Sequence, residues 1–480
     1  MISRPLTLKR VYLCGTIAAV GLAYFFFLVG YPRLIYDSWA YYVLAGILRD
    51  EGPSHWPLFM AELRTYGYPL FLALATGWHP VAADTHRLIV FHVQLILFLL
   101  ACGWIGRSLA RICGSPSAGL SGYLAGALNV FLLSHATEPI SDLLSAVLVG
   151  VAVALSWKLP GDSGRFGSSA RAFLAFSAAG LAAVVRPVNI VVVGALLVVW
   201  LCRGILFRDV PPVAVGAMLL GLFLPLLPQM ALNYAVFKSP QPLIVKSLYR
   251  MQTEWGMSAL KYATDVRPGK SPGLEYVNPL YRGERTPAAF FRKRPIAYAA
   301  TLGLHGFAMM DHDFLFTYVT EARPWYRWPA AILNYVLLYA AGLGGILAVR
   351  RWRRVGKIDE VSFVFLSTAV TAAAYWVIHL PVKVENRFAL PLDLLAVPFI
   401  AFGAMSAARL IRGPGARKRV LALLFSAALF VGACASLSFW LTRQAPGLRQ
   451  NDVPRAGSPE RASFRPPTSL SGGSGSRSRC

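Results

Sequence analysis

The sequence predicts an all-α polytopic membrane protein with about eleven transmembrane helices. Of its 480 residues, 56% are hydrophobic and only 14% are charged, whereas soluble domains carry roughly a quarter charged residues. Apolar runs near the length that crosses a bilayer, about 20 residues of helix, recur along the chain. Lys and Arg outnumber Asp and Glu by 47 to 22. The placement of these basic residues must therefore separate a membrane protein from a nucleic-acid binder.

Eleven apolar runs account for the predicted helices. The first follows Lys9 and Arg10, but it is longer than the apolar core of a signal peptide and has no convincing cleavage site, so we interpret it as an uncleaved anchor. The runs lie near residues 11–31, 86–106, 118–134, 137–157, 172–186, 187–206, 213–230, 325–349, 361–380, 388–408 and 419–441.

The basic residues of the short connections fall mostly on one side of the membrane. With the N-terminus inside, the opposite side carries only Arg186, Lys383 and Arg387. This asymmetry is the positive-inside pattern, so it explains the net charge of +25 without nucleic acid as a partner. The inner connections carry Arg107, Arg111, Lys158, Arg165, Arg171, Arg203, Arg208, the run RRWRR at 350–354, Lys357, Arg409, Arg412, Arg417, Lys418 and Arg419.

The domain organisation follows from the same pattern. Residues 1–443 are predicted to form one transmembrane domain with two long outer segments, 32–85 and 231–324, which hold many of the acidic residues. Residues 444–480 are rich in Ser, Gly, Pro and Arg. A segment of this composition cannot bury a core, so disorder is expected there.

Two acidic positions in the first outer segment are candidates for chemistry. The stretch after the first apolar run predicts a helix along the membrane surface, with Asp37 and Tyr41 one turn apart. An acid at a helix start is often only a favourable partner of the helix dipole. The neighbouring stretch AELRTYGYPLFLAL, which carries Glu62, Arg64 and Tyr66, favours a functional site instead.

A third acidic group lies at the outer start of the fourth run, in SHATEPISDLL at 134–144. Glu138 and Asp142 are four residues apart and therefore on one helix face. A polar helix cap is the ordinary alternative. Acids at the mouth of a membrane helix are costly, however, and usually face the bundle interior or a water-filled cavity.

Basic residues occur at the outer ends of later runs. Arg186 lies between the fifth and sixth runs, and Lys383, Glu385 and Arg387 precede the tenth. Each cation alone could simply extend its charge toward the interface. Charges of both signs on one face, however, indicate phosphate binding combined with acid–base chemistry.

The motif MMDHDFLFTY contains Asp311, His312 and Asp313. It is similar to the Asp-x-Asp motif with which some nucleotide-sugar enzymes hold a metal. Nucleotide sugars are cytoplasmic, and this segment is predicted outside. A structural role is therefore favoured, and no metal ligand is assigned.

The order of these features resembles the GT-C glycosyltransferases, in particular bacterial protein mannosyltransferases and lipid A aminoarabinose transferases. The resemblance covers roughly residues 8–440. It rests on the outer helix with Asp37, the turn from Arg64 to Phe71, the T-E-P-x-S-D pattern from Thr137 to Asp142, the pair Arg186 and Pro187, the N-Y-x-V-F stretch from Asn233 to Phe237, and the stretch from Glu385 to Pro391.

The resemblance implies a GT-C-like fold in the bacterial inner membrane, with its active site facing the periplasm. It implies transfer of a sugar from a polyprenyl-phosphate carrier to a hydroxyl of a lipid, glycan or protein acceptor, with inversion. No cofactor is assigned, and a divalent cation is left open. The expected roles are catalysis by Asp37, Glu62 and Asp142, binding of the donor phosphate by Arg64, Arg186, Lys383 and Arg387, and substrate positioning by Tyr41, Tyr66, Glu138 and Glu385.

A secondary transporter or lipid flippase of the cell envelope is the alternative from another functional class. Such proteins typically have charged residues near the membrane midplane, interrupted helices and internal repeats. The acids here cluster near the outer ends of the runs, and no convincing repeat is visible. The pattern therefore favours the transferase.

Overall fold

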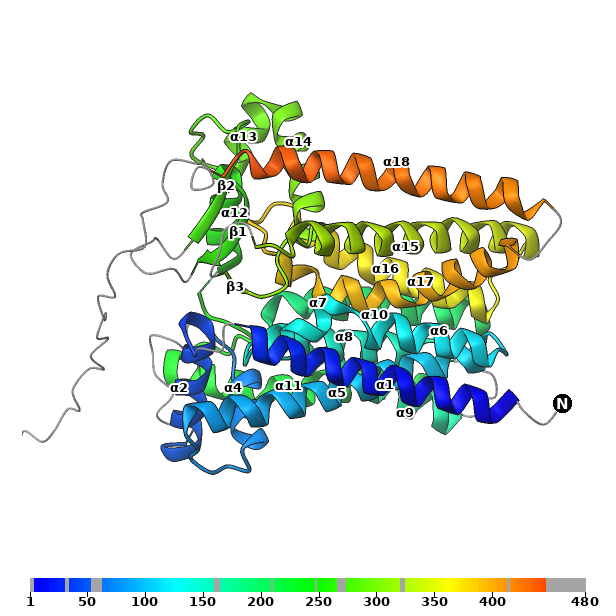
Figure 1. Cartoon of the computed structure of the whole chain (residues 1–480). Coiled ribbons are helices and arrows are strands. Elements are labelled where there is room, and N and C mark those ends of the chain that lie inside the picture. Colours follow the sequence, from blue (N-terminus) through cyan, green and yellow to red (C-terminus); the bar gives the residue numbers. More distant parts are fainter. Residues whose placement is uncertain are drawn as a thin grey trace, which may run out of the picture.

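Long helices run side by side through the molecule, and short helices and a small sheet gather at one end of the bundle (Figure 1). The structure is a computed structural model that describes residues 4–30, 34–52, 63–158, 165–208, 210–246, 248–265, 273–319, 324–411 and 415–445. The predicted tail at 444–480 lies almost wholly outside these residues, and so does Glu62.

Nine helices among the described residues are long and apolar enough to cross a membrane. They confirm the predicted all-α, multi-pass architecture, and each corresponds to one of the predicted apolar runs. They are α1 (Arg4–Val29), α5 (Ala83–Ile112), α9 (Arg165–Val185), α10 (Ile190–Phe207), α11 (Pro212–Phe237), α15 (Arg327–Val355), α16 (Glu360–His379), α17 (Leu390–Ile411) and α18 (Ala416–Thr442).

The two remaining predicted runs form shorter helices, so the expected count of eleven long helices is not reached. The run at 118–134 is divided into α6 (Pro116–Ala127) and α7 (Val130–His135), because the Asn129 side chain accepts hydrogen bonds from two backbone N–H groups and starts a new helix. The run at 137–157 begins only at α8 (Ser141–Ser156). Arg171 donates to the carbonyl oxygens of Leu155 and Trp157 and so satisfies the end of this short helix.

The remaining elements form a cap at one end of the bundle. The cap contains α2 (Tyr36–Asp50), α4 (Gly67–Ala75), α12 (Leu248–Ser258), α13 (Pro287–Lys293) and α14 (Pro295–Met310), and two 3₁₀ turns, η2 (Pro187–Asn189) and η3 (Asn386–Ala389), join neighbouring helices. The sheet has the order β2-β1-β3, from β1 (Ala259–Asp265), β2 (Gly273–Val277) and β3 (Tyr318–Val319). Strand β1 pairs antiparallel with β2 and parallel with β3, and its Lys261 bridges to Val384.

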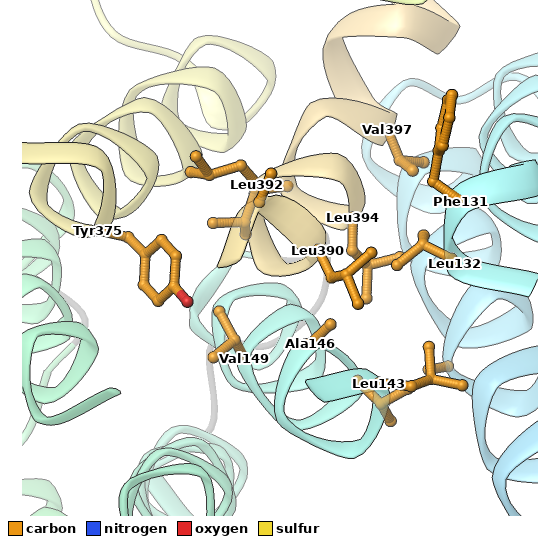
Figure 2. Close-up of a cluster of buried hydrophobic side chains, with 14 of the residues drawn as sticks. Phe131, Leu132, Leu143, Ala146, Val149, Tyr375, Leu390, Leu392, Leu394 and Val397 are labelled. Carbon is orange, nitrogen blue, oxygen red and sulfur yellow. The ribbon is translucent and has the colours of Figure 1, made fainter. Parts of the chain in front are cut away.

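The core lies where α7, α8, α16 and α17 meet. Figure 2 shows part of this core, in which Phe131 and Leu132 of α7, Leu143 of α8 and Leu390, Leu394 and Val397 of α17 belong to one buried cluster. Helix α17 is largely buried, whereas the apolar stretch of α18 has no buried residue and packs mainly along α15 and α17. The buried start of α17 therefore holds η3, the turn just before it, in a fixed place.

Candidate active site

Asp37 begins the site, one residue into α2. Arg64 Nη2 donates to its Oδ1, and Arg387 Nη2 donates to its Oδ2 at 3.1 Å. Burial raises the pKa of Asp37, but the guanidinium groups of Arg64 and Arg387 outweigh burial and lower it to about 2. The carboxyl is therefore ionised at neutral pH. Its side chain is 30% exposed, so it remains accessible to a ligand.

Arg387, in the turn η3, contacts three carboxylates at once. Besides Asp37, its Nη1 lies 3.7 Å from Asp142 Oδ2, and its Nε lies 2.6 Å from Glu385 Oε2. A guanidinium has five N–H donors in one plane and can therefore serve several acceptors at once. Arg387 therefore joins side chains from α2, α8 and the segment before α17.

Asp142 and Arg186 form a second ion pair beside the first. Asp142 is almost fully buried in the first turn of α8, and Arg186 lies at the end of α9, with its guanidinium 4.6 Å from the ring centre of Phe388. A buried charge is tolerated only with a partner. The three arginines and the three carboxylates of this site thus balance each other before any ligand binds.

The segment that carries Arg64 is fixed by its neighbours. The Arg64 guanidinium lies over the ring of Tyr41, 5.1 Å from its centre. Tyr66 donates from its hydroxyl to Pro225 O and from its backbone N–H to Gln229 Oε1, both on α11. These contacts hold Tyr66 away from the cavity, as an anchor for the segment beside Arg64.

The ion pairs line a cavity of about 560 Å³. Its polar lining residues include Asp37, Tyr41, Arg64, Ser141, Asp142, Arg186, His379 and Arg387. Its apolar lining residues include Ile190 and Val191 of α10, Ile378 of α16, and Leu248 and Trp255 of α12. A cavity with charged and apolar lining residues suits a ligand with a charged head and a lipid chain.

Five of the charged residues that the sequence singled out therefore meet in one place: Asp37, Arg64, Asp142, Arg186 and Arg387. Tyr41 joins them, and its hydroxyl lies 3.4 Å from Ser141 Oγ. Glu385 contacts the group through Arg387. The predicted clustering of outer charges thus agrees with the geometry, while the chemical roles stay predictions.

Lys383 lies outside this group. Its Nζ pairs with Glu275 Oε1 of β2 at 2.5 Å and lies 4.0 Å from the ring centre of Tyr262. It is not one of the described residues that line the cavity. The phosphate-binding role predicted for Lys383 therefore has no geometric support, because the sheet already supplies its partners.

Glu138 is not among the described residues that line the cavity. Its Oε1 accepts the backbone N–H of Thr317 at 3.2 Å, and its side chain is nearly inaccessible to solvent. Burial raises the pKa of Glu138 to about 7, because removal from water disfavours the charged form. The geometry thus links Glu138 to the strand segment at 317–319, and its predicted contact with substrate stays a prediction.

His379 and Phe388 line the cavity, although the sequence analysis assigned them no role. His379 ends α16 and hydrogen-bonds with its own helix, from Nδ1 to Tyr375 O at 2.8 Å. Its position at the outer end of the run at 361–380, directly before the PVKVENR segment, is the signal that could have identified it. Phe388 gave no such signal, because an aromatic residue beside an apolar run is common.

Asp311 and Asp313 belong to a separate buried cluster. Lys261 Nζ lies 2.7 Å from Asp313 Oδ1 and donates to Asp311 O at 2.6 Å. Asp311 also accepts from Tyr335 and Ser438, and Asp313 from Tyr276 and Asn386. His312 Nε2 lies 3.0 Å from Asp393 Oδ2.

Among the described residues, no three His, Cys, Asp or Glu side chains are grouped to hold a metal. These contacts support the structural role favoured by the sequence.

Comparisons with known proteins identify the fold. No family model and no curated protein sequence matches this chain. Among solved structures, the oligosaccharyltransferase of Archaeoglobus fulgidus in its apo form matches with a TM-score of 0.50 and 12% identity, over 91% of this chain and 56% of that chain. The Archaeoglobus fulgidus enzyme in complex with an inhibitory peptide and a dolichol-phosphate gives a TM-score of 0.48 and 11% identity, over 93% and 56%. This chain thus spans little more than half the length of either structure. The GT-C-like fold predicted from the sequence is confirmed.

Proposed function

We propose that this chain is a membrane glycosyltransferase that moves a sugar from a polyprenyl-phosphate carrier to an acceptor hydroxyl, with inversion, at the periplasmic face of a bacterial inner membrane. The observation that carries the proposal is the meeting of Asp37, Arg64 and Arg387 in a cavity that also has many apolar lining residues. The shared fold of the oligosaccharyltransferase supports the reaction class.

Donor binding follows from the charges of the cavity. A phosphodiester is an anion, and a guanidinium binds its oxygens with two parallel hydrogen bonds. Arg64, Arg186 and Arg387 all reach the cavity. The prenyl chain would contact apolar lining residues such as Ile190 and Ile378. No nucleotide is needed, because the carrier already holds an activated sugar.

The transfer step needs a proton acceptor and stabilisation of a leaving group. The acceptor oxygen attacks the anomeric carbon, the bond from that carbon to the phosphate oxygen breaks, and the hydroxyl proton passes to the Asp37 carboxylate. The arginines stabilise the negative charge that develops on the leaving phosphate. Attack from the face opposite the phosphate gives inversion.

The arginine contacts of Asp37 give this step an order. With a pKa of about 2, Asp37 is a weak base in the free site. A donor phosphate that takes over the donors of Arg64 and Arg387 removes part of this stabilisation, so the pKa of Asp37 rises. Donor binding would thus prepare Asp37 to accept the proton.

The test is transfer in proteoliposomes from radiolabelled polyprenyl-phosphate hexoses and pentoses, with a total membrane extract as acceptor. General-base catalysis contributes roughly 10²–10⁴-fold to a rate. We therefore expect Asp37→Asn to lower transfer at least 100-fold while the protein still inserts and folds. Full activity of Asp37→Asn would remove Asp37 from the mechanism.

Asp50→Asn is the matched control. Asp50 lies on the same helix, but its carboxylate is exposed and pairs only with the neighbouring Arg49 among the described residues. Transfer by this variant should equal that of the wild type. If the protein transfers sugar from none of the carriers but moves a labelled lipid across the membrane, the transporter or flippase is favoured instead.

A further inference from the structure

The helix that carries Asp37 has an unusual beginning. Its N-cap residue is Ile35, whose side chain has no oxygen to accept a hydrogen bond from the first turn. The next residue, Tyr36, has a φ of +47°. For a residue other than glycine, this left-handed conformation costs roughly 1–2 kcal/mol. Such a start persists only where surrounding contacts enforce it.

Two side chains contact this turn. The Ser38 hydroxyl accepts the backbone N–H of Ile35 at 2.9 Å and donates to the Ile35 carbonyl oxygen at 2.8 Å, and a distant tyrosine, Tyr318, makes the other contacts. The hydroxyl of Tyr318 accepts the backbone N–H of Ser38 at 3.1 Å and donates to the backbone oxygen of Ile35 at 2.9 Å. An N-cap side chain normally accepts from the second or third N–H of its helix, and Ser38 occupies the third position. Tyr318 thus does what the side chain of Ile35 cannot do, although 280 residues separate it from Ser38.

Tyr318 is itself held firmly. It is 4% exposed and lies in β3, where it pairs with Thr264 of β1. The preceding N–H, that of Thr317, donates to the buried carboxyl of Glu138. The hydroxyl of Tyr318 is therefore a fixed point against which the start of α2 is set.

We infer that Tyr318 is a positioning residue for Asp37, which keeps the left-handed turn at Tyr36 so that the Asp37 carboxylate faces Arg64 and Arg387. The kinetic test of this inference rests on the proposed transferase function. The test by hydrogen exchange rests on the hydrogen bonds alone. In this inference, Tyr36 is the strained residue and Tyr318 is the group that maintains the strain. Loss of the hydroxyl lets Tyr36 relax to a negative φ, and Asp37 then leaves its partners.

The experiment combines Tyr318→Phe with Tyr36→Gly. Tyr318→Phe keeps the ring and removes only the hydroxyl, so we expect kcat for transfer to fall about 10-fold with little change in the KM for the donor. Glycine adopts a positive φ without steric cost. In the double variant, the glycine at position 36 should keep the turn without the Tyr318 hydroxyl and raise kcat at least threefold over Tyr318→Phe. Tyr36 is about half exposed, and its ring centre lies 6.4 Å from that of Tyr318, so Tyr36→Gly alone is the reference for loss of this ring contact.

Hydrogen exchange gives a readout that needs no activity. Amides in the first turn of α2 should exchange faster in Tyr318→Phe and slow again in the double variant. Tyr281→Phe is the control, because Tyr281 also lies in the outer region and donates to one carbonyl, Glu284 O. It should change neither exchange in α2 nor kcat.

Each outcome decides the inference. The inference is overturned if Tyr318→Phe has the kcat and the α2 hydrogen exchange of the wild type. It is also overturned if Tyr318→Phe lowers kcat and speeds exchange but the added Tyr36→Gly change reverses neither effect. If the wild type transfers no sugar from any donor, the proposed function fails, while the exchange data still decide whether Tyr318 holds the turn.

Discussion

At the residue scale, the site depends on ionisable side chains that occupy the outer ends of apolar runs. Asp142 and Arg186 could be selected from the sequence because a charge at such a depth is costly and needs a partner. The same rule selected Lys383. It could not show that Glu275, more than 100 residues earlier in the chain, would bind Lys383, because the pairing of β1 with β2 creates that contact.

Glu138 gives a pH-dependent prediction. Its pKa of about 7 in the folded protein lies above the usual glutamate value, so the folded state binds the proton more tightly than the unfolded state does. Stability is therefore unaffected by this group below pH 4 and decreases as the pH rises from about 4.5 to 7. The total loss is at most about 3.5 kcal/mol, since one pKa unit corresponds to about 1.4 kcal/mol.

Glu138→Gln should remove this loss. The amide oxygen can still accept the N–H of Thr317, and the variant cannot ionise. Thermal unfolding in detergent at pH 5 and pH 8 checks the prediction. The melting temperature of the variant should fall less over this range than that of the wild type, whereas equal falls would show that Glu138 carries no such penalty.

At the element scale, the close approach of α4 to α9 places Arg64. A Cβ built on Gly67 would lie 2.4 Å from Val184 O, a backbone atom that cannot move aside alone. This glycine is visible in the sequence, in the TYGYPLF turn, but only the packing of α4 against α9 explains why a residue without a side chain is needed there. A glycine here lets the segment that carries Arg64 approach the end of α9, directly before Arg186.

Gly67→Ala should therefore push α4 away from α9. Overpacking of this kind costs about 1–3 kcal/mol, and the displaced Arg64 segment should also lower transfer. Gly194→Ala in α10 is the control, because no atom lies within 4 Å of its built Cβ and alanine favours a helix. Thermal unfolding and transfer measured on both variants test the prediction. Unchanged stability of Gly67→Ala would contradict it.

The division of two apolar runs was not predictable from hydropathy. The run at 118–134 is uniformly apolar enough to suggest one helix, yet Asn129 caps a new helix within it. Hydropathy averages over about 20 residues and is insensitive to one capping side chain. Averaged hydropathy therefore predicts the approximate positions of the long helices. It does not predict the number or the ends of the short helices.

At the scale of the whole molecule, the small sheet of the cap connects the segments that carry Asp37 and Arg387. Strand β3 carries Tyr318, which holds the start of α2 beside Asp37. In strand β1, the N–H of Tyr262 donates to the carbonyl oxygen of Val384, which lies shortly before Arg387 in the chain. Asp313, fixed by Lys261 of β1, accepts from Asn386. The cap is therefore the framework that sets Asp37 against Arg387, although the sequence predicted only its surface helix with Asp37 and not its sheet.

The orientation of the molecule gives the last prediction. Asp50 is the last residue of α2 in the cap, and Arg353 lies in the last turn of α15, a helix that runs from the cap toward the opposite end of the bundle (Figure 1). Both side chains are exposed.

The positive-inside rule assigns RRWRR at 350–354 to the cytoplasm, and the proposed function requires the cap outside. The pair Asp50→Cys and Arg353→Cys, each in a variant whose six natural cysteines are replaced by alanine, tests both assignments. In intact cells, a membrane-impermeant maleimide should label the cysteine at position 50 and should reach position 353 only after permeabilisation. The opposite pattern would place the cavity in the cytoplasm and exclude a periplasmic transfer.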